Sequence, residues 1–174
     1  HFERAATWGD PVASIHHIEL ADMDGDGFPD VVVNNSEISW FKNMGGSGTW
    51  SAPKLIKKTF STAYTWMRPL DLDSDGDMDM VYNASNRAKW LENTNGLGTA
   101  WSAEKELDGS NRTTAADMAD IDGDGLKDLV LTLFGPGPVW FKRKPGGFDA
   151  YQYILLGAIK MAGADQSLCT GDPD

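Results

Sequence analysis

Twelve aspartates recur at fixed spacings in three short segments of this sequence, and carboxylates in such a pattern could hold a metal ion. Each segment has aspartate at its first, third, fifth and ninth positions and glycine at its sixth. Ca²⁺ is a hard cation that takes about six to eight oxygen ligands in a flexible geometry, so three carboxylates on one tight turn suit it. The glycine has no Cβ and permits the sharp bend. The predicted side-chain ligands are Asp22, Asp24, Asp26 and Asp30; Asp71, Asp73, Asp75 and Asp79; and Asp120, Asp122, Asp124 and Asp128.

The seventh position of each segment would add a neutral oxygen, the backbone carbonyl of Phe28, Asp77 or Leu126. Asp77 carries a further carboxylate, and we interpret its side chain as pointing to solvent. We expect about three Ca²⁺ ions, one per loop. We expect these ions to be structural and not catalytic, because four aspartates and a carbonyl leave little room for a substrate.

Two other interpretations of the aspartate loops are disfavoured. An EF-hand needs a glutamate at position twelve and a helix on each side, whereas position twelve here holds Val33, Tyr82 or Leu131 within apolar runs. An acidic surface turn without metal could explain one loop, but three copies in the same register argue against it. Thirteen of the 26 acidic residues lie in these segments, so half of the negative charge would repel itself unless a cation is bound.

The loops belong to a longer repeat, because their first aspartates lie 49 residues apart in both intervals. Each loop runs into an apolar stretch, then a tryptophan followed by an apolar residue, then a glycine-rich turn. Each unit therefore reads as four short strands, which in the first unit are roughly 14–21, 30–34, 38–43 and 53–60. A period near 49 with four strands and one such tryptophan is typical of a β-propeller blade. The tryptophans that we expect between neighbouring sheets are Trp40, Trp90 and Trp140.

The loop Asp-x-Asp-x-Asp-Gly-x-x-Asp, the strand after it and the later Trp-Phe or Trp-Leu resemble the FG-GAP/VCBS repeat family, the Ca²⁺-binding blades of integrin-α-like β-propellers. The resemblance covers about residues 14–156. It implies an all-β fold of about three four-stranded antiparallel blades, within a larger propeller or one completed by a homo-oligomer. It also implies metal ligands at all twelve aspartates. Family members include adhesion receptors, lectins and propeller domains of polysaccharide lyases, so the fold does not determine the function.

On this basis the chain divides into three blades with a partial segment at each end. We expect the last strand of a preceding blade at 1–13 and the start of a further blade at 158–174. The three blades are expected at 14–62, 63–111 and 112–157.

Net charge, hydropathy and sequons limit the classes of partner and the location of the protein. The formal net charge of -11 disfavours nucleic acid, whose protein partners are normally basic. No apolar run is long enough for a membrane span. Calcium loops and the sequons at Asn34, Asn83 and Asn111 favour the secretory route and an extracellular or cell-surface location. The single cysteine, Cys169, is either an unpaired thiol or half of a disulfide to another chain.

Our first hypothesis is a non-enzymatic, calcium-stabilised module that binds an extracellular protein or a glycan. A lectin, and the propeller part of a carbohydrate-active enzyme such as a polysaccharide lyase, are the alternatives. The sequence contains no Gly-x-Ser-x-Gly, His-Glu-x-x-His or Cys-x-x-Cys motif, so we expect no catalytic residues within it.

Overall fold

The computed structural model describes residues 15–35, 37–46, 48–58, 66–107, 113–135 and 137–154. All regular elements in these residues are β-strands, and all of their pairings are antiparallel. The part of the chain that the structure describes contains no helix with the length and hydrophobicity of a membrane span.

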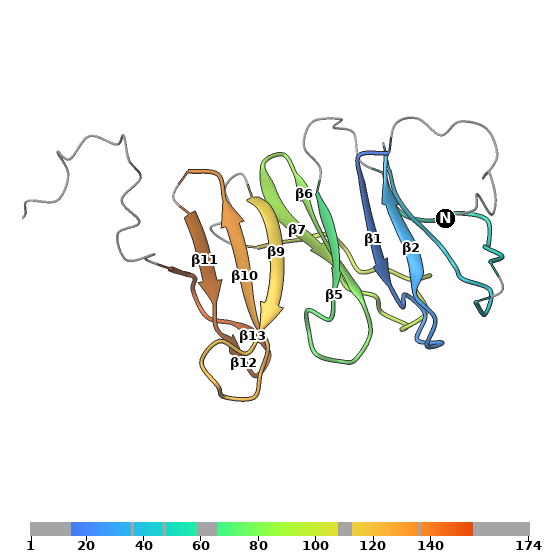
Figure 1. Ribbon diagram of the computed structural model, residues 1–174. Helices are drawn as coiled ribbons and strands as arrows, with labels where there is room; N and C mark the ends of the chain where they lie inside the picture. Colours follow the sequence, from blue (N-terminus) through green and yellow to red (C-terminus); the bar gives the residue numbers. More distant parts are fainter. Residues whose placement is uncertain are drawn as a thin grey trace, which may run out of the picture.

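Three four-stranded sheets follow one another along the chain and stand side by side (Figure 1). The first sheet has the order β1-β2-β3-β4, the second β5-β6-β7-β8, and the third β9-β10-β11-β14. A small hairpin of β12 and β13 interrupts the third sheet. The strands are β1 (His17–Ala21), β2 (Asp30–Asn34), β3 (Glu37–Phe41), β4 (Lys54–Lys58), β5 (Met67–Leu70), β6 (Asp79–Ala84), β7 (Arg87–Leu91), β8 (Lys105–Glu106), β9 (Thr113–Ala119), β10 (Asp128–Leu133), β11 (Gly137–Phe141), β12 (Arg143–Lys144), β13 (Gly147–Phe148) and β14 (Gln152–Tyr153).

This architecture confirms the predicted fold class, an all-β chain built of β-propeller blades. The described strands of the three blades lie within 14–62, 63–111 and 112–157. The end segments 1–13 and 158–174, together with Cys169, lie outside the described residues.

Two apolar cores fill the spaces between successive blades. One core joins the first blade to the second and contains Trp40 and Met80, both with no exposed surface. The other joins the second blade to the third and contains Val81 and Leu129, which are equally buried. The second strand of each blade (β2, β6 or β10) carries apolar side chains on both faces, so each blade can pack against two neighbours.

Hydrogen bonds from tryptophan rings cross both interfaces between blades. Trp40, predicted to lie between the sheets, donates its indole N–H to the carbonyl oxygen of Gly98 in the second blade at 2.9 Å. Trp66 donates its indole N–H to the carbonyl oxygen of Thr113 in the third blade at 2.6 Å. Trp66 is therefore a structural residue, because its ring is buried and its one donor is used.

The sequons at Asn34 and Asn83 do not present exposed acceptor side chains in this fold. Asn34 has no exposed surface at the end of β2. Asn83 is also buried, and its side-chain amide donates to the carbonyl oxygen of Thr113 at 2.6 Å. Asn34 is the last residue of β2 and Asn83 lies inside β6, so both belong to a sheet and not to the turn that follows it. Asn111 lies outside the described residues.

Replacing Gly98 with alanine should destabilise the protein by about 2 kcal/mol or more. Gly98 has a φ of +62°, which alanine adopts at a cost of about 1 kcal/mol. A Cβ there would also lie 2.9 Å from Cζ2 of Trp40 and 3.0 Å from the Met23 carbonyl oxygen, so the interface between the blades would have to shift. Chemical denaturation of both proteins measures the difference.

Gly48→Ala is the matched control, because Gly48 has a similar φ of +75° but no atom within 4 Å of an added Cβ. It should show only the backbone cost. Equal losses for the two variants would mean that the close packing around Gly98 contributes nothing.

Candidate metal centre

The three aspartate loops connect corresponding strands of the three blades. They join β1 to β2, β5 to β6 and β9 to β10, and Figure 1 shows all three along the lower side of the molecule. A register in which Ala21 pairs with Asp30 closes the first loop, and the pairs Leu70–Asp79 and Ala119–Asp128 close the others. The repeat therefore presents the same carboxylates at the same place in each blade.

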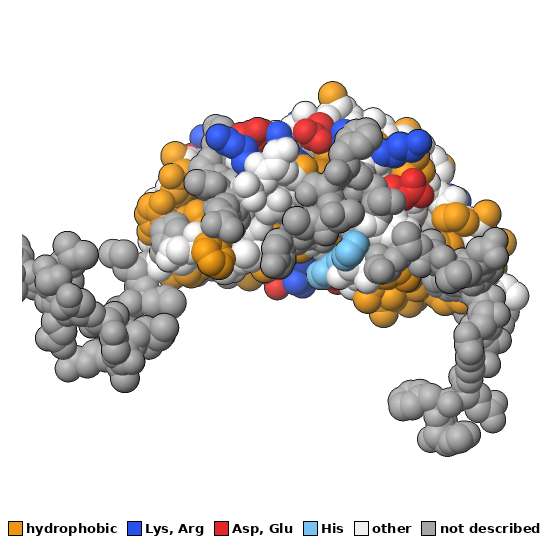
Figure 2. All heavy atoms as spheres, turned by 90° about the horizontal axis from the view of Figure 1, so that it is seen from above, with side chains coloured by type: hydrophobic (Ala, Val, Ile, Leu, Met, Phe, Trp, Pro, Cys, Tyr) orange, Lys and Arg blue, Asp and Glu red, His pale blue; other side chains and the backbone are white. Residues whose placement is uncertain are grey.

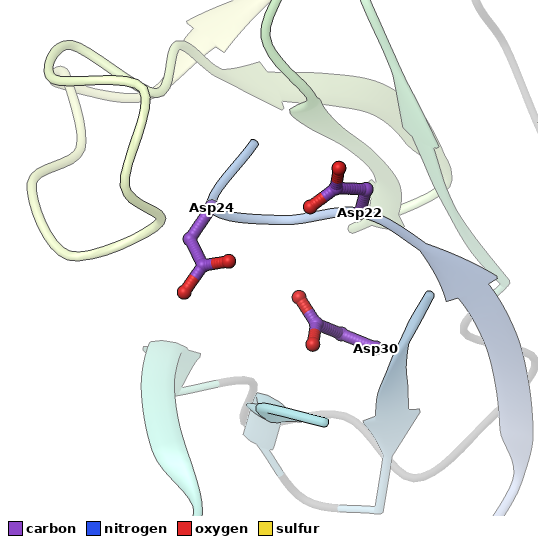
Figure 3. A group of neighbouring side chains, drawn as sticks. All are labelled: Asp22, Asp24 and Asp30. Atoms are coloured by element: carbon purple, nitrogen blue, oxygen red, sulfur yellow. The ribbon is translucent and has the colours of Figure 1, made fainter. Parts of the chain in front are cut away.

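Each loop brings three carboxylate oxygens within 4.8 Å of one another. In the first loop Asp22, Asp24 and Asp30 turn toward a common space (Figure 3). The third loop groups the corresponding aspartates, whereas the second uses its fifth-position aspartate in place of its ninth. The groups of the second and third loops are Asp71, Asp73 and Asp75, and Asp120, Asp122 and Asp128.

The first-position aspartate also shapes its own loop. Asp22 accepts hydrogen bonds from the backbone N–H groups of Asp26 at 3.1 Å and Gly27 at 2.7 Å. Asp120 accepts from three backbone N–H groups of the third loop, those of Gly123, Asp124 and Gly125. These bonds hold the carboxylate inside the turn, where a cation could reach it.

The ninth-position aspartates have a structural role that the sequence analysis missed. Each is fully buried and accepts hydrogen bonds with both carboxylate oxygens. One oxygen accepts from the backbone N–H of the second residue of the loop. The other accepts from the backbone N–H of the third residue after the repeat tryptophan, just beyond the end of the third strand. In the second blade, Asp79 accepts from the backbone N–H groups of Leu72 and Asn93, both at 2.9 Å. The same pairs of bonds join Asp30 to Met23 and Asn43, and Asp128 to Ile121 and Arg143. We call this arrangement the aspartate clasp.

Lysine side chains reach the fifth-position aspartates in two of the loops. Lys42 donates to Asp26 at 2.5 Å and also pairs with Asp24, while Lys142 pairs with Asp122 and with Asp124 at 3.0 Å. The hydrogen bond from Lys42 is the main cause of the lowered pKa of Asp26. Asp26 and Asp124 are predicted ligands that fall outside the close carboxylate groups.

The second loop concentrates negative charge. Burial, followed by repulsion from Asp75 and the other loop carboxylates, raises the pKa of Asp77 to about 6. Burial also raises the pKa of Asp79 to about 7, although its two backbone hydrogen bonds oppose the shift. The pKa of Asp73 is raised by burial first and then by Asp75 and Glu92 among others. Burial is the larger cause of these raised pKa values and repulsion between the loop carboxylates adds to it, and a bound cation would offset both effects.

The donor set fits a hard divalent cation. The Oδ1 atoms of Asp24, Asp71 and Asp77 are buried and have no hydrogen-bond partner among the described residues. Oxygen-only, anionic ligands with buried free lone pairs suit Ca²⁺, and their desolvation is costly unless a cation compensates. The interpretation of Asp77 as pointing to solvent is wrong, because its Oδ1 is buried and its Oδ2 faces Gly96. The side chains of Phe28 and Leu126 are exposed and carry no ligand atom, so these residues could contribute only their backbone carbonyl oxygens.

Comparison with known proteins identifies the repeat. A family model described as an FG-GAP-like repeat matches residues 22–82 and again residues 71–131. No curated protein matches the chain.

Among solved structures, a lectin of Agrocybe aegerita, described as recognising non-reducing terminal N-acetylglucosamine, superposes with a TM-score of 0.59 at 22% identity. The match covers 78% of this chain and 37% of the lectin chain, so this chain spans little more than a third of that protein's length. The Tc holotoxin pore of Photorhabdus luminescens gives a TM-score of 0.49 at 22% identity, over 70% of this chain and 6% of that one.

Proposed function

Because the chain belongs to the FG-GAP-like repeat family, we propose that it is a calcium-stabilised, non-enzymatic β-propeller module that binds a protein or a glycan outside the cell. The observation that carries this proposal is the group of three carboxylate oxygens within 4.8 Å in each of three successive blades. We call each of these groups of three carboxylates a metal cradle, and the three cradles would hold three ions. In each cradle, Ca²⁺ would supply charge neutralisation and tie the loop together, while the aspartates supply the oxygens.

An extracellular location would supply the calcium that such loops require. Extracellular calcium modules have Kd values of roughly 10⁻⁴–10⁻³ M, and sites of that strength fill only where calcium is millimolar. The net charge of -11 would fall in magnitude with every ion bound. In a binding module the calcium-loaded loops can stay rigid, because no substrate has to reach the metal ion.

Native mass spectrometry in millimolar calcium tests the proposed metal content. We expect three bound Ca²⁺ ions on the folded chain, and none on a matched variant with Asp24→Asn, Asp73→Asn and Asp122→Asn. Each substitution removes one negative charge from one cradle and keeps the size of the side chain. Absence of bound calcium on the unmodified protein would refute the proposal.

A glycan is the second, narrower candidate for the partner. It is favoured by the fold that this chain shares with the Agrocybe aegerita lectin. A glycan array that includes terminal N-acetylglucosamine separates the two classes. Specific binding would establish a lectin, and no binding at high protein concentration would leave a protein partner. The remaining alternative is that the blades form the non-catalytic part of a longer carbohydrate-active enzyme.

We further propose that another blade packs on the face of the first sheet that carries Ile18 and Leu20. Ile18 and Leu20 on β1 pair with Val33 and Val31, and these residues lie on the opposite face from Val32, which packs against the second blade. Ile18 is 59% exposed and Leu20 66%. Figure 2 shows hydrophobic side chains gathered at both ends of the row of blades. The covering blade belongs either to the same chain or to a second copy, and sedimentation equilibrium decides, because a monomer excludes the second copy.

A further inference from the structure

The residue two positions after each repeat tryptophan differs in charge between the blades. It is Lys42 in the first blade, Glu92 in the second and Lys142 in the third, at equal intervals of 50 residues. In each blade it follows the strand whose end is bound by the aspartate clasp, so its side chain starts beside the metal cradle.

The two lysines contribute a positive charge directly to their cradles. Lys42 pairs with Asp24 and Asp26, and its side chain is three-quarters buried while doing so. Lys142 pairs with Asp122 and Asp124 in the same manner. Asp24 and Asp122 are members of the close carboxylate groups, so each ammonium group competes with a metal ion for the same carboxylate.

The second cradle has no such ammonium group. Among the described residues, no lysine or arginine forms an ion pair with an aspartate of this loop. Glu92 adds a carboxylate and is itself paired with Lys105 at 2.6 Å. Arg143 of the third blade reaches this loop, but its guanidinium donates to the hydroxyl of Ser74 and not to a carboxylate. The buried Oδ1 atoms of Asp71 and Asp77 therefore keep free lone pairs.

We propose that the second loop is the high-affinity calcium site of this chain, and that Lys42 and Lys142 are built-in counter-ions that lower the calcium affinity of the first and third loops. This inference rests on the proposed function, since it assumes that calcium enters all three cradles. Calcium affinity rises with the number of anionic ligands. A cation must displace the lysine from two loops, whereas it only relieves repulsion in the second.

The expected difference in affinity is about tenfold or more. One added or removed unit charge within about 5 Å of a divalent ion changes its binding by roughly this factor even at the dielectric constant of water. Isothermal titration of the metal-free protein with calcium should therefore show one tight site and two weaker ones. Asp73→Asn should abolish the tight site, and Asp24→Asn should abolish one of the weak sites.

Charge substitutions at the three equivalent positions test the role of the lysines. Lys42→Gln combined with Lys142→Gln should strengthen the two weak sites about tenfold, and Glu92→Lys should weaken the tight site by a similar factor. Lys58→Gln is the matched control, because it removes the same charge from an exposed position at the opposite end of the first blade. It should leave all three affinities unchanged. Circular dichroism spectra confirm that each variant is folded.

The outcomes separate this inference from the function on which it rests. Three equal sites that ignore the lysine substitutions would overturn the inference and leave calcium binding intact. A tight site that survives Asp73→Asn but is lost with Asp24→Asn would also overturn it. No calcium binding at any loop would overturn both.

Discussion

Replacing Asp79 with alanine should lower the free energy of unfolding by about 3 kcal/mol, even in excess chelator. Asp79 is fully buried, and its two oxygens accept the backbone N–H groups of Leu72 and Asn93. The substitution leaves two buried donors without an acceptor, and each unsatisfied group costs about 1–3 kcal/mol. It also frees the loop from the end of β7. Denaturant titration in the presence of EGTA measures the loss.

Two comparisons isolate the clasp from the metal. Asp117→Asn is the surface control, because its side chain is 66% exposed, pairs with Arg68 and otherwise accepts from the backbone N–H of its neighbour Met118. It should change stability by less than about 0.5 kcal/mol. Asp24→Asn, which alters a predicted ligand outside the clasp, should be destabilising in calcium but nearly neutral in chelator. If Asp79→Ala were harmless in EGTA, the clasp would be a metal-binding feature alone.

Removal of calcium should lower the melting temperature of the protein by about 10 °C. A ligand at ten times its Kd stabilises the folded state by about 1.4 kcal/mol per site, so three sites contribute about 4 kcal/mol. For a chain of this size each kcal/mol corresponds to roughly 2–4 °C. Differential scanning calorimetry in millimolar calcium and in EGTA measures the shift.

The triple variant Asp24→Asn, Asp73→Asn and Asp122→Asn is the control for this experiment, since it should melt at one temperature with or without calcium. Magnesium in place of calcium should restore little of the shift, because Mg²⁺ demands a tighter octahedral shell and gives up its water reluctantly. An unmodified protein whose melting temperature ignores EGTA would contradict a stabilising role for the metal.

The repeat made the blades and the loop positions predictable. The apolar run after the loop and the turn signals placed β2 at 30–34, which is where the structure has it, and the 49-residue period carried the assignment to the other blades. The tryptophan of the first blade was correctly expected between sheets, since Trp40 is fully buried there. Such features are local or periodic, so one sequence contains enough information to show them.

The features that were missed depend on contacts between distant residues. A side chain such as Asp79 looks like a metal ligand in sequence, and only the fold shows that Asn93, fourteen positions later, donates to it. Likewise the sequon at Asn83 looks exposed until the third blade is placed against it and Thr113 becomes its partner.

The pairing of lysines with the loop aspartates could not be predicted from the loop motif either. Lys42 lies sixteen residues after Asp26, so no loop motif includes it, and only the pairing of β2 with β3 brings it to the cradle. A comparison of the three repeats at that position would have shown the alternation of lysine and glutamate. That alternation is a signal for unequal sites and not for the presence of a site.

The most direct test of calcium binding by all three loops is a crystal structure determined in millimolar calcium with anomalous diffraction data. The account predicts an anomalous peak in each loop, about 2.3–2.6 Å from aspartate oxygens, with the ammonium groups of Lys42 and Lys142 displaced from the carboxylates. Loops without a peak, with both lysines still paired to Asp24 and Asp122, would contradict it.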